Sequence, residues 1–277
     1  HPDRAAELAR GALRLLRRIG HAPLEHADAV VGENGFRLVL VNVHAGAASE
    51  GDAVAEVKEI ARTFANPKFD IKVIEHANHL GLRQHILACG DLSNEYGSVI
   101  VIEDDLVIDP HFYSFARAAL DFFDVDARVA GIALYSPEVA EPSGLPFKPM
   151  FNGFSTYPMK FPCSWGQAWT KNQWAAFRNW LDGKDALYLD SLAQLPPTVK
   201  AWPETSWKKY FAGYLVDQDK YIQYPYEGFS THRSDYSGTN IQKNSSVYQV
   251  ALGLPSRPQS SYAFTSDNTV AYDAFFE

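Results

Sequence analysis

The sequence of 277 residues contains only two cysteines, Cys89 and Cys163. Two cysteines are too few for a disulfide framework or for a metal site built from cysteine ligands, and they are typical of a reducing compartment. The chain also lacks a basic excess, because 25 Lys and Arg stand against 33 Asp and Glu, for a formal net charge of -8. This balance argues against a protein that binds nucleic acid through a basic face.

No segment of the sequence reaches the ~18 consecutive apolar residues of a membrane-spanning helix. The chain begins at His1 without a Met or an apolar leader, so we expect a piece of a longer protein whose targeting segment is not included. Apolar material is plentiful, since 46% of the residues are hydrophobic and 13% are aromatic. That content suffices for a sizeable core, in one large domain or in two closely packed halves.

Strand-like and helix-like segments alternate over the first part of the chain. Apolar runs typical of buried strands are FRLVLVNV at 36–43, FDIKVIEH at 69–76, GSVIVI at 97–102 and VAGIALY at 129–135. Helical spacing of apolar residues occurs in DAVAEVKEIARTF at 52–64, GLRQHILACGDL at 81–92 and DPHFYSFARAALDFF at 109–123, which Asp109 is expected to cap. The alternation predicts an α/β fold with a mostly parallel central sheet flanked by helices, in which ligands bind beyond the carboxyl ends of the strands.

The composition changes after Tyr135. Residues 136–165 are rich in Pro, Gly and aromatic residues, which predicts a long loop over one end of the sheet. Two helices and a short strand are expected beyond it, in TKNQWAAFRNWLDG at 170–183, TSWKKYFAGYLV at 205–216 and KYIQYP at 220–225. We therefore expect two halves of one domain, residues 1–135 and residues 136–277.

Three adjacent acids, Glu103, Asp104 and Asp105, follow the run GSVIVI. Adjacent carboxylates at the end of a buried strand repel one another and lose hydration energy. A divalent cation that bridges a diphosphate would compensate them, and Mg²⁺ or Mn²⁺ suits such hard oxygen ligands. The alternative is that one acid caps the next turn and the others face the solvent.

Four segments of the chain resemble, in the same order, the nucleotide-sugar-dependent glycosyltransferases of GT-A fold. The resemblance is to bacterial family 2-like enzymes and to the animal N-acetylglucosaminyltransferase I type. It covers residues 76–240, and the acidic triplet corresponds to the DXD-like motif of these enzymes. The segments are HANHLGLRQHILACGDL at 76–92, YGSVIVIEDDLVIDPHFYSFARAAL at 96–120, CSWGQAWTKNQWAAF at 163–177 and DYSGTN at 235–240.

The resemblance implies a nucleoside diphosphate sugar as donor and Mn²⁺ or Mg²⁺ as cofactor, with residues 1–135 as the donor-binding half and residues 136–277 as the acceptor-binding and catalytic half. Asp105 would coordinate the metal, while Glu103 and Asp104 would contact ribose, the donor sugar or metal-bound water. The start of the helix at 81–92 would lie near the nucleotide, through Gly81, Leu82 and Arg83. Arg83 is either a phosphate ligand or an ordinary surface arginine at a helix start.

The sequence departs from the family pattern at two places. The family often has an aspartate for the donor base after the first strand, where this chain has His44, so the resemblance places His44 at the base and leaves the identity of the base open. The late histidine of the family is replaced by Asn240. Nearby His232 is the alternative metal ligand, although a loop or core histidine is the other interpretation.

Sugar transfer with inversion needs a general base that deprotonates the acceptor hydroxyl. The resemblance favours Glu204 in AWPETSWKKYF, although the matching position can also fall on Thr205. An acid stabilised by the helix macrodipole is the structural alternative for Glu204. Trp165 is expected either to stack on a sugar ring or to pack in the core. Further candidates for the base are Asp182, Asp185 and Asp190.

Together these features predict a metal-dependent, inverting hexosyl- or N-acetylhexosaminyltransferase, acting on a carbohydrate or glycolipid acceptor in the synthesis of cell-surface polysaccharide or lipopolysaccharide. The alternatives are a sugar-phosphate nucleotidyltransferase and a non-catalytic carbohydrate-binding domain with a GT-A-like fold. The bacterial character of the resemblance implies a cytoplasmic location rather than a secretory lumen. Association with the inner face of the membrane, and a place in a larger multidomain enzyme, are open alternatives.

Overall fold

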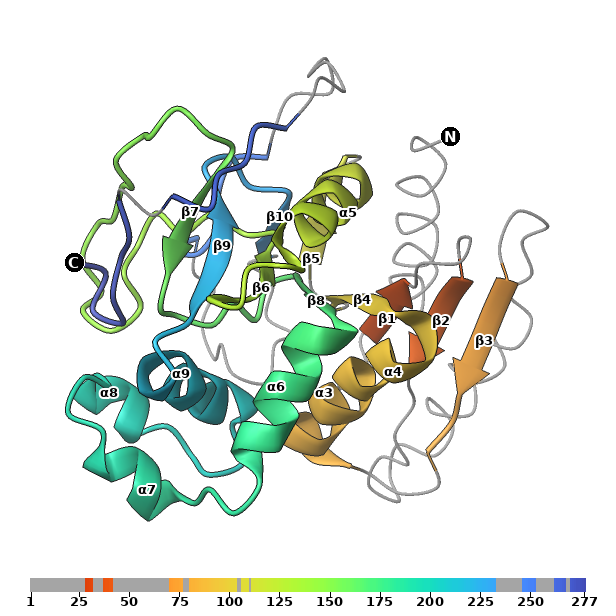
Figure 1. Ribbon diagram of the computed structural model, residues 1–277, viewed down its shortest axis with the longest axis horizontal. Coiled ribbons are helices and arrows are strands. Elements are labelled where there is room, and N and C mark those ends of the chain that lie inside the picture. The colour runs from red at the N-terminus through yellow and green to blue at the C-terminus, as the bar shows by residue number, and fades with distance from the viewer. Residues whose placement is uncertain are drawn as a thin grey trace.

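The computed structural model describes residues 28–31, 37–41, 70–76, 80–103, 106–109, 111–232, 246–252, 262–267 and 270–277. In these residues the fold is mixed α/β, with helices on both faces of a central 8-stranded sheet. In Figure 1 the sheet runs across the molecule from β3 to β7, with α5 on one side and α3 and α6 on the other.

The central sheet has the strand order β3-β2-β1-β4-β8-β6-β9-β7. Its strands are β1 (Asp28–Val31), β2 (Arg37–Val41), β3 (Asp70–Ile74), β4 (Ser98–Ile102), β6 (Val129–Ala133), β7 (Thr156–Met159), β8 (Gln167–Thr170) and β9 (Tyr221–Pro225). A separate small sheet pairs β5 (Leu106–Ile108) with β10 (Ser230–His232). The strands predicted from FRLVLVNV, FDIKVIEH, GSVIVI, VAGIALY and KYIQYP are confirmed.

The central sheet is mixed, and the expectation of a mostly parallel sheet is wrong. Among the described strands, the pairs β2–β3 and β6–β9 are parallel, whereas β1–β2, β1–β4, β4–β8, β6–β8 and β7–β9 are antiparallel. One cause is β1, a strand that the sequence patterns did not predict. Only residues 32–36 separate it from β2, and so short a connection joins antiparallel strands. The other cause is that β7 and β8 join the sheet from the second half of the chain.

The segment expected to be one long loop at 136–165 contains β7, which lies at the end of the strand order. Pro158 is in β7, where its carbonyl accepts from Tyr272 N at 3.0 Å, and the last strand of the order tolerates a residue without a backbone N–H. β8 follows and lies between β4 and β6, so residues 1–135 and 136–277 contribute strands to the same sheet.

The amphipathic segments of the sequence form helices where they were predicted. The helix α6 begins with a capping box, in which Thr170 Oγ1 accepts from Gln173 N at 3.2 Å and Thr170 N donates to Gln173 Oε1 at 3.1 Å. The helix predicted at 52–64 lies outside the described residues. The described helices are α3 (Gly81–Asp91), α4 (Ser93–Tyr96), α5 (Phe112–Phe123), α6 (Lys171–Leu181), α7 (Ala186–Ser191), α8 (Pro197–Lys200) and α9 (Trp207–Asp217).

The start of α5 differs from the prediction, because its N-cap residue is His111 and not Asp109. The backbone N–H of Asp109 donates to the Phe229 carbonyl at 2.8 Å, which extends the β5–β10 ladder and holds Asp109 in the extended chain. The Asp109 carboxylate instead accepts from His111 N at 2.8 Å, and its Oδ1 lies 3.0 Å from His111 Nδ1. Both side chains are buried.

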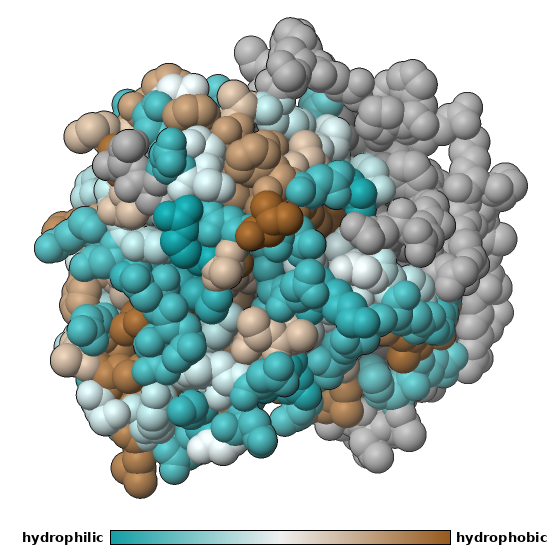
Figure 2. All heavy atoms as spheres, viewed as in Figure 1, coloured by the Kyte–Doolittle hydropathy of each residue, from teal (hydrophilic) through white to brown (hydrophobic). Residues whose placement is uncertain are grey.

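The core has two parts, one on each face of β4. Side chains alternate across a strand, so Val99 and Val101 pack into the cluster formed with α3, α6 and α9, and Ile100 and Ile102 pack into the cluster formed with α5. Figure 2 shows hydrophilic side chains over most of the described surface on one face, with hydrophobic ones in small scattered groups. Within the described residues, no helix is both long and apolar enough to cross a membrane.

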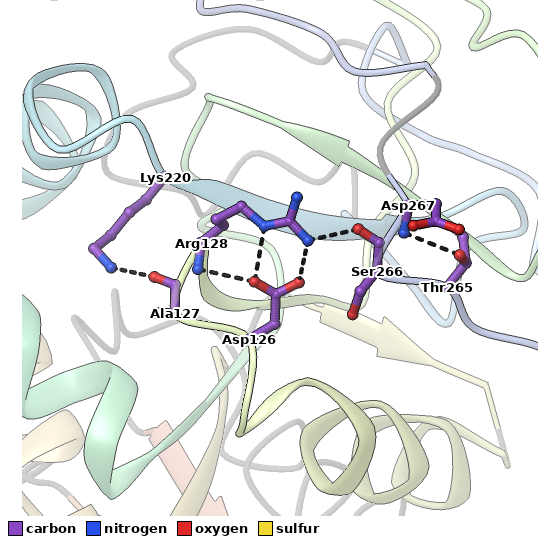
Figure 3. Close-up of polar contacts among 7 residues, drawn as sticks. All are labelled: Asp126, Ala127, Arg128, Lys220, Thr265, Ser266 and Asp267. Carbon is purple, nitrogen blue, oxygen red and sulfur yellow. Dashed lines mark hydrogen bonds and ion pairs between the residues drawn. The ribbon is translucent and has the colours of Figure 1, made fainter.

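Polar contacts hold the C-terminal segment against the start of β6 (Figure 3). The Arg128 guanidinium donates to the Asp126 carboxylate through Nε at 3.0 Å and Nη2 at 2.8 Å, and Nη2 also donates to the Ser266 carbonyl at 2.6 Å. Lys220, next to β9, donates to the Ala127 carbonyl. These contacts join three segments that are distant in the sequence.

The hydrogen bonds from Arg128 lower the pKa of Asp126. A carboxylate with a lowered folded-state pKa contributes stability above its unfolded pKa, and this contribution is lost as the pH falls through the folded pKa. We expect Asp126→Asn to lower the free energy of unfolding at pH 7 by at most about 1 kcal/mol, because half-exposed Arg128 is screened by water.

Urea unfolding of the protein and of Asp126→Asn at neutral pH and at about pH 3 measures this contribution, since a free Asp titrates near pH 4. The difference between the two proteins should shrink at the lower pH. Asp121→Asn is the matched control, because the Asp121 side chain is 60% exposed and that of Asp126 10% exposed. An equal effect of Asp126→Asn on the free energy of unfolding at both pH values would contradict a stabilising role of the ionised Asp126 carboxylate.

Candidate functional site

The pairing of β4 with β8 places Trp165 at the end of β4 that is followed by the acidic motif. The two strands are antiparallel, with Val101 opposite Gln167. Glu103 follows Val101 by two residues, and Trp165 precedes Gln167 by two residues, so both lie at the same end of the strand pair. This is the carboxyl end of β4, at which the sequence predicts the donor site.

The pairing of β5 with β10 brings His232 to the same end. His232 lies opposite Leu106, the residue that directly follows the acidic motif. The His232 side chain is buried, in a strand rather than in a loop, and its ring centroid is 6.0 Å from that of Trp165. Ser230 Oγ, in the same strand, donates to the Trp165 carbonyl at 2.5 Å. Two strand registers therefore place His232 and Trp165 beside the acidic end of β4.

The first turn of α3 carries three predicted donor-binding residues, Gly81, Leu82 and Arg83. Gly81 has a φ of +72°, a conformation in which any other residue except Asn or Asp is strongly disfavoured. The N-cap residue Leu80 makes no side-chain hydrogen bond to this turn. Uncapped N–H groups at a helix start attract anions such as phosphate. The turn is therefore suited to the predicted contact with a diphosphate.

Arg83 links α3 to the turn that contains Glu204. The centre of the Arg83 guanidinium lies 3.7 Å from the centroid of the Tyr210 ring, and Nη1 donates to the Glu204 carbonyl oxygen at 3.1 Å. Arg83 Nε is buried, and no group in the described part of the chain accepts its proton. Arg83 is therefore held in place by α9 and is not a freely moving surface arginine, while one of its donors is left for another acceptor.

Glu204 precedes α9 and is exposed to solvent. Its contact with Arg83 uses the backbone carbonyl, so the carboxylate is not required for that bond. Ser206 is the N-cap of α9 and accepts from Lys209 N at 3.3 Å, while Thr205 is exposed. The position of Glu204 is compatible with a general base and with an acid that stabilises the start of α9. Its role stays a prediction.

The other carboxylates considered for the base lie around α7. Asp185 caps this helix, because its Oδ1 accepts from Tyr188 N at 2.8 Å. Asp182 is the C-cap residue of α6, and Asp190 is an exposed residue within α7. The capping bond gives Asp185 a structural role that needs no catalysis.

Trp165 is half-buried in a cluster of aromatic rings. Its centroid lies 4.8 Å from that of Tyr135 and 4.9 Å from that of Tyr248. The Tyr135 hydroxyl donates to the Tyr248 carbonyl at 3.1 Å, which fixes the segment 246–252 next to Trp165. Trp165 thus combines packing contacts with an exposed part, and a sugar ring can contact only that part.

An ion pair that no pattern of residues indicated adjoins Trp165. Lys208 Nζ, on α9, donates to both carboxylate oxygens of Glu141 at 2.6 and 2.8 Å. The same Nζ lies 5.4 Å from the ring centroid of Trp165 and 5.3 Å from that of Trp202. Glu141 and Lys208 are 67 residues apart in the chain, and no local pattern connects them.

Three predicted site residues, Asp104, Asp105 and His44, lie outside the described residues, as does Asn240. In the remainder of the chain that the structure describes, no group of three or more His, Cys, Asp or Glu residues is placed to hold a metal ion. Glu103 supplies a carboxylate directly before Asp104. His232 supplies an imidazole from the strand residue opposite Leu106, which directly follows Asp105. The carboxylate is a ligand type that Mn²⁺ and Mg²⁺ favour, and the metal site stays a prediction.

The structure therefore gathers predicted residues from distant parts of the sequence around the carboxyl end of β4 and the start of α9. No protein-family model matches the chain, and a comparison with curated proteins gives no match. A proposal of function therefore rests on the contacts at this site.

Cys163 lies two residues before Trp165 and is not a nucleophile. Its Sγ donates to the Gly166 carbonyl at 3.6 Å, and burial raises its pKa to about 12. Cys89 is buried as well. We expect neither thiol of the folded protein to react with a disulfide reagent at pH 8, and both to react after unfolding in urea. Rapid labelling of the folded protein at either position contradicts this description.

Proposed function

We propose that the protein is a metal-dependent glycosyltransferase with a GT-A-like fold. It transfers a hexosyl or N-acetylhexosaminyl group from a nucleoside diphosphate sugar to a carbohydrate or glycolipid acceptor, with inversion. The observation that carries the proposal is the meeting of Glu103, Trp165 and His232 at the carboxyl end of β4. A carboxylate and an imidazole suit a cation, and an aromatic face suits a sugar ring.

The donor side of the proposed site is formed by β4 and α3. Asp105 holds Mn²⁺ or Mg²⁺ with help from His232, and Glu103 and Asp104 contact the ribose, the sugar or metal-bound water. Arg83, held by Tyr210 and the Glu204 carbonyl, adds a guanidinium charge that suits a phosphate, and the start of α3, to which Leu80 gives no side-chain cap, adds backbone N–H groups. The resemblance leaves His44 as the candidate contact with the nucleotide base.

The acceptor hydroxyl attacks the anomeric carbon from the face opposite the diphosphate. Glu204 takes the hydroxyl proton, the new glycosidic bond forms, and the electrons of the broken C–O bond pass to the diphosphate oxygen. When bound, Mn²⁺ or Mg²⁺ supplies positive charge that stabilises the departing diphosphate. Arg83 binds to the backbone of Glu204, so the donor side and the base are held in one geometry.

Replacing Asp105 tests the metal site. We expect Asp105→Asn to reduce Mn²⁺-dependent hydrolysis of the donor, or transfer from it, by at least about 100-fold, because the variant loses charge where the cation binds. Asp121→Asn, on the exposed side of α5, is the matched control and should keep the activity of the parent protein. Turnover is measured by release of nucleoside diphosphate from a panel of nucleotide sugars. Unchanged turnover in Asp105→Asn refutes the proposal.

Two further assays, one for pyrophosphate release and one for sugar binding, separate the rival functions. A sugar-phosphate nucleotidyltransferase would instead release pyrophosphate from a nucleoside triphosphate and a sugar 1-phosphate. A non-catalytic carbohydrate-binding domain would bind sugars without turnover of any nucleotide sugar. Either result would replace the glycosyltransferase by that function.

Replacing Glu204 tests the base. We expect Glu204→Gln to lower kcat for transfer by about 100-fold or more while the KM for the donor stays within about twofold, because proton removal affects the chemical step alone. Asp121→Asn, which removes an exposed carboxylate on α5 outside the proposed site, is the control. A normal kcat in Glu204→Gln would show that this carboxylate only stabilises the start of α9.

A further inference from the structure

The ion pair of Glu141 and Lys208 is largely withdrawn from water. The exposed fractions of the two side chains are 20% and 11%, whereas those of the surface pair Glu95 and Lys72 are 49% and 44%. Taking both charges out of water costs several kcal/mol, and their attraction seldom exceeds that cost by much. Two apolar residues of similar size would stabilise the fold about as well, so stability alone gives no reason for charges here.

Aromatic rings surround the ammonium of this pair. Lys208 Nζ lies 5.1 Å from the ring centroid of Phe161, in addition to its contacts with Trp165 and Trp202. Phe161 is buried, while both tryptophans are half-buried and therefore accessible in part. The partly exposed Glu141 carboxylate lies in the same group. Its charge raises the pKa of Tyr248, after the larger effect of burial, which places Tyr248 near it as well.

We propose that Glu141 and Lys208, together with Trp165 and Trp202, bind a neutral sugar residue of the acceptor. The pair has no net charge, so it does not select a charged ligand. It does present a strong acceptor and a strong donor of hydrogen bonds, which suit the hydroxyl groups of a sugar. The tryptophan faces suit the apolar C–H face of a pyranose. A small number of fixed polar groups among aromatic side chains is typical of sites for small ligands.

The position of the pair fits the acceptor and not the donor. Trp202 precedes the candidate base Glu204 by two residues, and Trp165 adjoins His232 at the acidic end of β4. A sugar that contacts these tryptophans would therefore lie on the side of the site that carries the base candidate. That the bound sugar belongs to the acceptor rests on the proposed glycosyltransferase function. That these residues bind a neutral sugar does not depend on it.

Saturation-transfer NMR with methyl glycosides of glucose, galactose, mannose and N-acetylglucosamine tests this inference. Spectra are recorded for the protein alone, and in the presence of Mg²⁺ with UDP or GDP, because paramagnetic Mn²⁺ would broaden the glycoside signals. We expect at least one glycoside to bind. In the double variant Glu141→Leu/Lys208→Met its affinity should fall by about tenfold or more, because the charge-assisted hydrogen bonds are lost. The double substitution leaves no unpaired buried charge, so the variant should fold.

The double variant Lys72→Met/Glu95→Leu removes the exposed pair and is the matched control, with unchanged glycoside binding expected. Circular dichroism and thermal unfolding confirm that both double variants are folded. Binding of no glycoside under any condition, or equal binding by Glu141→Leu/Lys208→Met, overturns the inference. Glycoside binding through this pair without turnover of any nucleotide sugar would refute the glycosyltransferase proposal alone. Turnover without glycoside binding would refute the sugar site alone.

Discussion

The backbone pairing of β8 with both β4 and β6 is the constraint on which the rest of the structure depends. It places a strand from the second half of the chain between two strands from the first half. Because β8 is antiparallel to β4, Trp165, two residues before β8, lies at the same end of the strand pair as Glu103, which directly follows β4. The Leu134 N–H donates to the Gly166 carbonyl at 2.9 Å and fixes the same entry against the end of β6. One register thus joins the acidic motif to the aromatic cluster.

The start of α9 provides the second connection. On one side Tyr210 and the Glu204 carbonyl hold Arg83, and on the other side Lys208 reaches Glu141 and Trp165. A cation stacked on an aromatic ring and a buried ion pair both lose most of their stabilising energy when either partner moves. These contacts therefore restrain the base candidate, the proposed donor site and the proposed acceptor site relative to α9. A preorganised geometry of this kind is what a transfer between two bound substrates requires.

The long amphipathic helices and the apolar strands could be predicted, because each has enough residues to show a period. β7 and β8 were missed because they have four residues each, and their sequences TYPM and QAWT contain polar residues or proline, so neither forms an apolar run like those of β4 and β6. Strand direction also has no local signature, which is why the mixed sheet was predicted as mostly parallel. At the site, Glu103, Arg83 and Trp165 could be proposed from motifs. The contact of Arg83 with Glu204 joins residues 121 apart, and only the fold brings them together.

The central claim is that the acidic end of β4 binds a nucleoside diphosphate through a divalent cation. The most direct test is the melting temperature of the protein with UDP, GDP, CDP or dTDP, in Mn²⁺ and again in EDTA. A ligand at 100 times its Kd stabilises the folded state by about 2.7 kcal/mol, which is a shift of several degrees. The account predicts such a shift for at least one nucleotide in Mn²⁺ and its loss in EDTA. No shift with any nucleotide, or an equal shift in EDTA, contradicts it.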